Sequence, residues 1–218
     1  MENLLNMQNK YNQQIKDFVN TCHKIADYNL VQCSSGNLSY RLDENLAVLS
    51  ASGSWLADIT EDQVAICSLN DGKCINEKTP TAESTFHLQI LKQRQDVNVV
   101  LHFQSPFATA ITCGNPDDYN FNLIPEIPYY IDPPAVVDYL PPGSQQLADT
   151  VTDALKDKDL AILRNHGLVT VGKDFNDVIQ KACFFELACR ILLLQDNPAF
   201  LTQKDVDNLS KGLVKYKT

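Results

Sequence analysis

Two of the four histidines occupy positions from which an imidazole could take part in chemistry. His102 lies near the end of the apolar run NVVLHF, and His166 lies at a sharp break, RNHGLV, between two further apolar runs. Side chains next to loops at the ends of strands often serve binding or catalysis. A lone histidine is more often a structural residue, but two at strand ends, with a carboxylate nearby, weaken that interpretation.

The nearby carboxylate is Glu83, which is predicted to stand in the first turn of a helix beginning at TPTAE. The helix dipole alone favours an acidic residue there. His87 follows four residues later, on the same helical face. Such a pair could bind a metal ion, but it more often makes a local hydrogen bond.

Two segments rich in serine and glycine could hold an anion. They are CSSGN at 33–37 and SASGS at 50–54. Glycine allows tight turns that direct successive N–H groups into one concavity, and serine and asparagine side chains add donors. Each segment alone is a weak signal, because the same residues make ordinary turns.

Helices that could position these groups follow from the apolar pattern. Apolar residues at helical spacing predict helices over 4–28 and 175–195, the second one capped by Asp174. Pro80 is expected to open a helix over 81–92, because proline suits the first helical position. Further predicted elements are a short helix with Ser105 as N-cap and Pro106 at its first position, a helix over 145–156, and a Thr60–Gln63 capping box.

Strands are predicted in the same way. They are expected at SYRL, over NLAVLSASG up to Gly53, in a hairpin at VAICSLNDGKCI with its turn at 70–72, at NVVLHF, and on both sides of His166. Residues 114–145, rich in Pro, Asn and Asp, are predicted to be a long irregular stretch. The mixture predicts an α/β fold with a mostly antiparallel or mixed central sheet flanked by helices.

Composition narrows the function classes. The chain has 218 residues, 44% apolar and 21% charged, which fits one globular domain over residues 1–218. Its formal net charge is −9 and it has no Lys/Arg stripe, so we expect no nucleic-acid partner. Seven cysteines without a CxxC pair favour a reducing cytoplasm. No apolar run approaches a membrane span, so we expect no membrane partner.

Five motifs in order resemble a known family. SSGNLSYR, SASGSWLADIT, TPTAESTFHLQIL, VVLHFQSPFATA and ILRNHGLVTVG look like the class II aldolase/adducin family, above all its L-fuculose-1-phosphate aldolases. The resemblance covers about residues 15–195. It implies a three-layer α/β fold with a central, mostly antiparallel sheet. It also implies a homotetramer with sites between subunits and a divalent metal, usually zinc, held by an HxH pair and a later histidine.

The resemblance assigns roles to individual residues. His102 corresponds to the first metal ligand and His166 to the last, and Glu83 falls on the catalytic acid/base. Tyr129, in IPEIPYY, falls on a tyrosine that acts as acid toward the aldehyde from the neighbouring subunit. Thr81 and Ala82 stand where family members usually offer two serines. The implied phosphate cradle consists of Ser35, Gly36, Asn37, Ser52, Gly53 and Thr81.

Gln104 departs from the family pattern, because it replaces the second histidine of the HxH pair. Residues i and i+2 of a strand face the same side, so Gln104 is still expected to point at the metal. Imidazole suits zinc, whereas amide oxygens suit harder ions. We therefore expect weaker zinc binding than in the family, or Mn²⁺ or Mg²⁺ instead. Three interpretations follow: the site holds another metal, Glu83 completes the coordination, or the site is inactive as in adducins.

The function expected from these residues is cleavage of a ketose 1-phosphate to dihydroxyacetone phosphate and an aldehyde by a metal-dependent lyase. A 4-epimerase or a decarboxylase on the same scaffold is a sister possibility, although the further Asp and Tyr associated with the epimerases are not found. The alternative from another class is a catalytically impaired, adducin-like binding or assembly protein, which Gln104 motivates.

Overall fold

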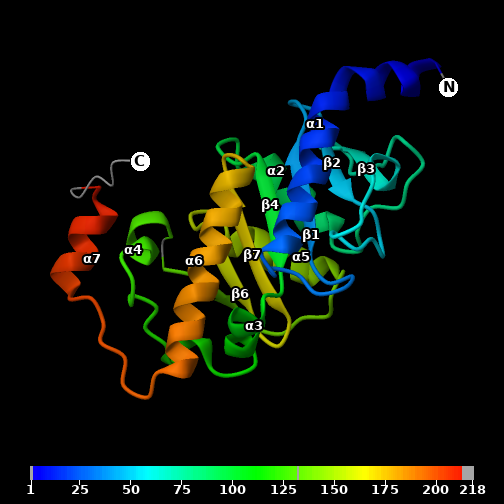
Figure 1. Ribbon diagram of the computed structural model, residues 1–218. Coiled ribbons are helices and arrows are strands. Elements are labelled where there is room, and N and C mark those ends of the chain that lie inside the picture. The colour runs from blue at the N-terminus through cyan, green and yellow to red at the C-terminus, as the bar shows by residue number, and fades with distance from the viewer. Residues whose placement is uncertain (1, 132, 213–218) are drawn as a thin grey trace.

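The computed structural model describes residues 2–131 and 133–212, which form helices packed on both faces of one sheet (Figure 1). The helices are α1 Glu2–Asp27, α2 Ser84–Gln93, α3 Pro106–Thr112, α4 Glu126–Tyr130, α5 Gln145–Ala154, α6 Phe175–Leu194 and α7 Gln203–Ser210, with short 3₁₀ turns η1 Glu61–Gln63 and η2 Pro116–Asp118. The strands are β1 Asn37–Arg41, β2 Leu46–Ser50, β3 Val64–Ser68, β4 Val99–Phe103, β5 Ala135–Val137, β6 Leu160–Leu163 and β7 Gly167–Gly172.

The sheet of the described residues has seven strands in the order β3-β2-β1-β4-β7-β6-β5. Every neighbouring pair is antiparallel except β5 and β6, which are parallel. The prediction of an α/β fold with a mostly antiparallel central sheet is therefore confirmed.

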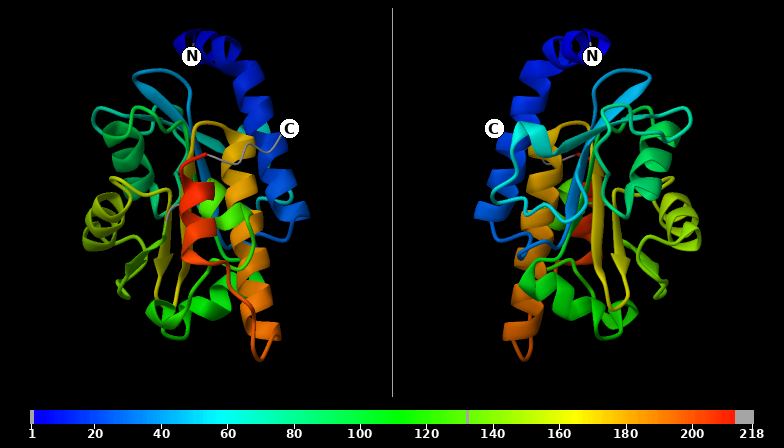
Figure 2. Two further views of the ribbon diagram at one scale, coloured as in Figure 1. Left: turned by 90° about the vertical axis from the view of Figure 1, so that its left-hand side faces the viewer. Right: turned by 90° about the vertical axis from the view of Figure 1, so that its right-hand side faces the viewer.

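Helices cover both faces of the sheet, as the edge-on views of Figure 2 show, and a buried apolar cluster lies on each face. Along β4, Val99, Leu101 and Phe103 join the buried cluster that includes α1, α3 and α6, whereas Val100 joins the cluster with α2 and α5. Successive side chains of a strand point to opposite faces. His102 therefore shares the face of Val100 and is directed toward α2.

The predicted start of α2 is wrong. The segment before this helix is held in extended form, since Ser52 N–H donates to Thr79 O, Thr81 N–H donates to Ser50 O, and Pro80 forms a bridge with Ala51. The helix consequently begins at Ser84, and Glu83 is its N-cap residue instead of a first-turn residue. Backbone pairing with the end of β2 has overridden the preference of proline for the first helical position.

Three other boundaries also differ from the sequence prediction. β2 ends at Ser50, before Gly53. The second arm of the predicted hairpin makes a single bridge, between Cys67 and Cys74, instead of a strand. Residues 114–145 are not wholly irregular, because they contain η2, α4 and the edge strand β5. A three-residue strand is too short to show a periodic apolar pattern.

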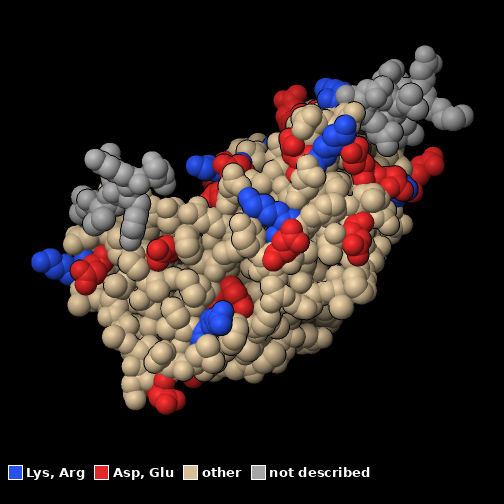
Figure 3. Space-filling model, viewed as in Figure 1, with Lys and Arg blue, Asp and Glu red and all other residues tan. Residues whose placement is uncertain are grey.

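The predicted caps are confirmed. Asp174 accepts from Asp177 N–H at 2.9 Å, and Pro106 occupies the first turn of α3 with Ser105 as N-cap residue. The side chain of Gln63 accepts from Thr60 N–H. Within the described ranges no helix combines the length and apolarity that a bilayer crossing requires. On the face shown in Figure 3, acidic and basic side chains are interspersed.

Candidate functional site

One hollow brings the predicted metal and phosphate residues together. Its volume is about 420 Å³, and its walls come from the loop before β1, the loop after β2, the start of α2, the end of β4 and the turn between β6 and β7. The predicted residues that line it are Ser35, Gly36, Asn37, Ser52, Gly53, Thr81, Glu83, His102, Gln104 and His166. They come from segments far apart in sequence, which the antiparallel sheet brings together at one end of its central strands.

His102 is oriented by the sheet itself. It lies opposite Asn37 in the antiparallel register of β1 and β4, and its side chain is buried. Its Nδ1 lies 2.9 Å from the carbonyl oxygen of Leu168, which can only accept, so Nδ1 carries the proton. Nε2 is thereby left with its lone pair, the usual arrangement for a metal-binding histidine.

His166 reaches the same place through the turn between β6 and β7. Asn165 adopts a left-handed conformation with φ of 55°, which turns the chain sharply before β7. A Cβ on Gly167 would lie 2.8 Å from Gln104 Cγ and 3.0 Å from His102 Cε1. Only glycine at 167 therefore lets the turn approach Gln104 and His102 this closely.

Glu83 stands between the two imidazoles and is 6% exposed. Its Oε2 lies 3.5 Å from His102 Nε2, and its Oε1 lies 3.4 Å from His166 Nε2. Burial raises the pKa of this carboxyl, but the neighbouring His102, the hydrogen bond from Asn37 and His166 outweigh burial and hold the pKa below its usual value. Glu83 is therefore ionised near neutral pH.

Burial and the neighbouring His102 lower the pKa of His166, with Glu83 opposing them. A lowered pKa keeps this imidazole neutral near pH 7, and a neutral imidazole is the form that binds metal ions.

These three groups fit a divalent cation. The ligand atoms of Glu83, His102 and His166 all lie within 4.8 Å of one another. Ligands at roughly 2.1 Å from a tetrahedral ion are roughly 3.4 Å apart, which matches the two carboxylate–imidazole distances. Among the described residues, Glu83 Oε1 and His166 Nδ1 are buried without a hydrogen-bond partner. A buried carboxylate whose two oxygens each face an imidazole nitrogen, one of those oxygens without a hydrogen-bond partner, is the chemistry of a cation site.

Gln104 follows the last residue of β4 and lines the hollow beside His102. Its half-buried side chain packs toward Gly167 through Cγ. That its amide oxygen contacts a metal ion stays a prediction.

The residues of the predicted phosphate cradle lie in two turns at one wall of the hollow. Gly36 and Gly53 have φ of 73° and 76°, and Ser35 Oγ accepts from Gln32 N–H at 2.9 Å. Thr81 lies at the same wall and is buried. Successive N–H groups in such turns favour anions.

The Gly36→Ala substitution is expected to lower the free energy of unfolding by about 2–5 kcal/mol. An added Cβ would lie 2.5 Å from Val31 Cγ1 and 2.8 Å from His102 O, and φ is positive. Left-handed backbone costs about 1–2 kcal/mol for alanine, and overpacking about 1–3 kcal/mol more. Gly53→Ala is the matched control, because its φ is similar but its added Cβ meets nothing within 4 Å. Urea denaturation of both variants measures the difference, and equal losses would contradict the steric argument.

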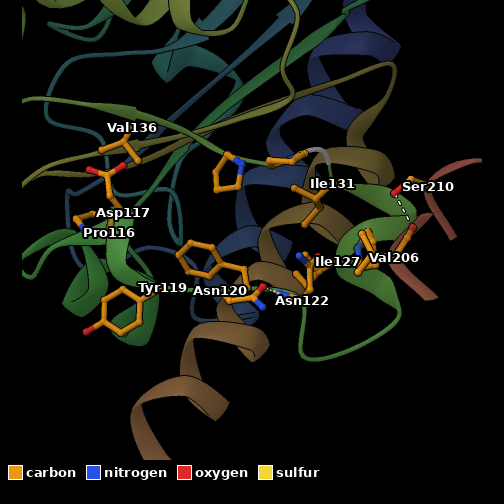
Figure 4. Close-up of a pocket in the computed structure, with 14 residues that line it drawn as sticks. Pro116, Asp117, Tyr119, Asn120, Asn122, Ile127, Ile131, Val136, Val206 and Ser210 are labelled. Atoms are coloured by element: carbon orange, nitrogen blue, oxygen red, sulfur yellow. Dashed lines mark hydrogen bonds between the residues drawn. The ribbon is translucent and has the colours of Figure 1, made fainter. Parts of the chain in front are cut away.

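Tyr129 is the predicted catalytic residue that the structure does not bring into this hollow. It lies in α4, half-buried, with its ring 4.6 Å from that of Tyr130. Its neighbours in α4, Ile127 and Pro128, line a different pocket of about 270 Å³ between the 116–122 segment, α4 and α7 (Figure 4). Among the described residues, the walls of that pocket are mainly apolar side chains and amides, and Asp117 supplies the carboxylate. The described part of this pocket holds no cluster of catalytic groups like that around Glu83.

His87 is placed differently from its sequence neighbour Glu83. Its ring is fully buried, and its two nitrogens pair with Ser39 Oγ and Asn37 Oδ1. The expected local hydrogen bond to Glu83 is therefore replaced by an indirect one, since Asn37 Nδ2 donates to Glu83 Oε2 at 2.9 Å. Sequence reasoning placed Asn37 in the cradle and missed this contact, because the partners are 46 and 50 residues apart.

Comparisons with known proteins agree with this geometry. The sequence family described as the Class II Aldolase and Adducin N-terminal domain matches residues 16–193 of this chain. An L-fuculose phosphate aldolase from Methanococcus maripaludis is 33% identical over 184 residues, which are 84% of this chain and 98% of that protein. A 3-oxo-tetronate 4-phosphate decarboxylase from Haemophilus influenzae is 27% identical over 180 residues, which are 80% and 85% of the two chains.

Solved structures share the fold. YgbL from Klebsiella pneumoniae superposes with a TM-score of 0.83 at 21% identity, covering 91% of this chain and 98% of that one. An L-fuculose 1-phosphate aldolase superposes with a TM-score of 0.80 at 19% identity, covering 91% and 95%.

Proposed function

Because the chain belongs to the class II aldolase and adducin family, we propose that it is a divalent-metal-dependent aldolase. Its relatives include aldolases, which are lyases, and related decarboxylases, and the chain is an enzyme of this kind. The proposed reaction cleaves an L-fuculose-1-phosphate-like ketose to dihydroxyacetone phosphate and an aldehyde. The single observation that carries the proposal is the buried, ionised Glu83 between two imidazoles, beside a Ser/Gly cradle.

The residues that would hold the metal ion are His102, His166 and Gln104, with Glu83 within reach. Zinc is the first candidate, because two imidazoles suit it, and Mn²⁺ or Mg²⁺ are the alternatives that an amide oxygen favours. Such an ion would supply Lewis-acid stabilisation of negative charge on substrate oxygens.

The chain's own residues account for positioning and proton transfer. The cradle of Ser35, Gly36, Asn37, Ser52, Gly53 and Thr81 binds the phosphate and so places the reacting carbons beside Glu83. In synthesis the Glu83 carboxylate takes a proton from the hydroxyl-bearing carbon next to the ketone, and in cleavage it returns that proton to carbon. Tyr129 of a neighbouring subunit gives a proton to the aldehyde oxygen in synthesis and takes it back in cleavage.

The test is turnover by protein of known metal content. The protein is purified without chelator or nickel, its metal is measured, and ketose 1-phosphates are offered with Zn²⁺, Mn²⁺ or Mg²⁺ while dihydroxyacetone phosphate is assayed. Release of dihydroxyacetone phosphate supports the proposal. Phosphate-ester binding without turnover under every metal would overturn it and favour the adducin-like binding or assembly role.

A decarboxylase is the second candidate, motivated by the relative that acts on 3-oxo-tetronate 4-phosphate. Loss of CO₂ from a 3-oxo acid 4-phosphate leaves the same enediolate that cleavage of a ketose 1-phosphate leaves. The same cradle and the same carboxylate therefore serve both reactions. Carbon dioxide release from the oxo acid, compared with aldehyde release from the ketose, distinguishes the two candidates.

A homotetramer with sites at subunit interfaces is part of the proposal. Tyr129 lies outside the hollow of its own chain, so its proposed role requires a second subunit. Exposed apolar side chains are available for such contacts on α6 and just beyond it, at Leu187, Leu193, Leu194 and Phe200.

We further propose that residues 1–218 form a single domain. We also propose a cytoplasmic location, in keeping with seven free cysteines, and no nucleic-acid or membrane partner.

The Gln104→His substitution is expected to tighten zinc binding by about 10–100-fold, the scale on which changes around a metal site act. It adds a third imidazole beside His102 and His166. Competition with a chromogenic chelator measures the change, and Gln89→His, on α2 outside this hollow, is the control. A rise in kcat together with tighter zinc binding would indicate an enzyme in which Gln104 weakens the metal site. Tighter zinc binding without a rise in kcat would indicate that the chemistry occurs elsewhere or is lost.

A further inference from the structure

A buried row of four hydrogen-bonded polar side chains lies between β1 and α2, behind the hollow. It consists of Ser39, His87, Asn37 and Glu83, of which only Asn37 and Glu83 line the hollow. Ser39 and Asn37 lie on the same face of β1, two residues apart, and His87 lies on α2, one turn after Glu83. All four side chains are less than a tenth exposed.

The Glu83 carboxylate, at one end of this row, fixes the direction of the hydrogen bonds along it. The ionised Glu83 carboxylate can only accept, so the Asn37 amide nitrogen faces it and the Asn37 oxygen faces His87. His87 Nε2 must then carry the ring proton and donate to Asn37 Oδ1. His87 Nδ1 is left as an acceptor, and Ser39 Oγ–H donates to it at 2.8 Å.

The protonation state of His87 agrees with this assignment. Burial, with the neighbouring His102 adding to it and Glu83 opposing it, lowers the pKa of His87 to about 3. A neutral imidazole has one N–H donor and one acceptor. In this row the donor meets Asn37 and the acceptor meets Ser39.

We propose that His87, oriented by Ser39, is a positioning residue that fixes the Asn37 amide and through it the Glu83 carboxylate. Without the donor from His87, the Asn37 amide loses one of the two partners that hold it and can rotate away from the Glu83 carboxylate. The Asn37 amide nitrogen has two hydrogens, and Glu83 uses one of them, so the other can meet a bound oxyanion. The same asparagine therefore links phosphate binding to the placement of the base.

Two substitutions separate positioning from packing. His87→Leu fills the space but removes the donor, whereas His87→Gln supplies an amide N–H near the position of Nε2. We expect His87→Leu to lower kcat by about 10–100-fold, the scale for outer-shell partners, and His87→Gln to recover most of this loss. His23→Leu is the matched control, because His23 Nε2 bonds a backbone carbonyl, that of Ile59, outside the hollow.

A double-mutant cycle tests the route through Asn37. In an Asn37→Ala background, His87→Leu is expected to change kcat by less than about twofold, because coupled residues are not additive. Independent, multiplying effects of the two substitutions would overturn the inference. Equal kcat in His87→Leu and the wild type would also overturn it, as would failure of His87→Gln to recover activity while it folds.

The kinetic readout rests on the proposed function, so crystal structures of both variants provide a readout without turnover. The Asn37–Glu83 hydrogen bond is expected to be lost or lengthened in His87→Leu and kept in His87→Gln. An unchanged Glu83 in His87→Leu would overturn the inference. A displaced Glu83 in a protein whose wild type turns over none of the sugar phosphates would support the positioning role and count against the aldolase activity alone.

Discussion

Substitution of Glu83 by glutamine is expected to lower kcat by about 10²–10⁴-fold, the usual contribution of a general acid or base. This corresponds to about 3–5 kcal/mol of transition-state stabilisation. Glutamine keeps the size of the side chain and can still meet Asn37 and the two imidazoles, but it cannot exchange a proton with carbon. The measurement is kcat for release of dihydroxyacetone phosphate at saturating metal.

Two controls make this result specific. Glu61→Gln removes a carboxylate from the exposed 3₁₀ turn and is expected to leave kcat unchanged. Metal content of Glu83→Gln must be measured beside its activity, because Glu83 lies within reach of the candidate cation site. A variant that binds metal and substrate and turns over like the wild type would remove Glu83 from the chemistry.

The His166→Ala substitution is expected to weaken metal binding by on the order of 10²-fold or more, since loss of an outer-shell partner alone costs 10–100-fold. His166 is one of only two imidazoles in the candidate site, and Gln104 cannot replace it with a comparable nitrogen ligand. Metal content after purification without chelator or nickel should fall from near one ion per chain to almost none. Activity should fall with it.

His23→Ala is the control for this loss, because His23 is hydrogen-bonded to a backbone carbonyl far from the hollow. Metal bound equally by the wild type and by His166→Ala would contradict the site. A wild-type protein that neither contains nor takes up Zn²⁺, Mn²⁺ or Mg²⁺ would contradict the aldolase mechanism as a whole.

Apolar runs in the sequence placed each of the two histidines, His102 and His166, at the end of a predicted strand. That the two meet in one site was implied only by the family resemblance, because β4 and β7 pair in the sheet although more than 60 residues separate them in the chain. The glycines of the cradle were predictable for a similar local reason, since each turn needs a positive φ.

Glu83 shows what local patterns miss. The structure places Glu83 beside His102 and His166, but its predicted position in the first turn of the helix was wrong, because Pro80 and Thr81 pair with the end of β2 instead of starting the helix. Glu83 is the N-cap residue of α2, and its side chain lines the hollow. Pairing between segments 30 residues apart leaves no trace in helical periodicity or capping patterns.

The contacts of His87 were beyond the sequence. His87 reaches Asn37 and Ser39 only because β1 and α2 lie against each other, a tertiary arrangement. Tyr129 was expected to act across a subunit boundary, and its place outside the hollow of its own chain leaves that role a prediction.

The hollow is assembled from six separate segments between residues 32 and 166, and this offers a way to identify the substrate. Any compound that occupies it must be released when the chain unfolds, so occupancy and the melting temperature are thermodynamically linked. A ligand at 100 times its Kd adds about 2.7 kcal/mol to stability, or about 5–10 °C for a chain of this size. A thermal-shift library of sugar phosphates and oxo-acid phosphates can therefore rank substrates before any reaction has been seen.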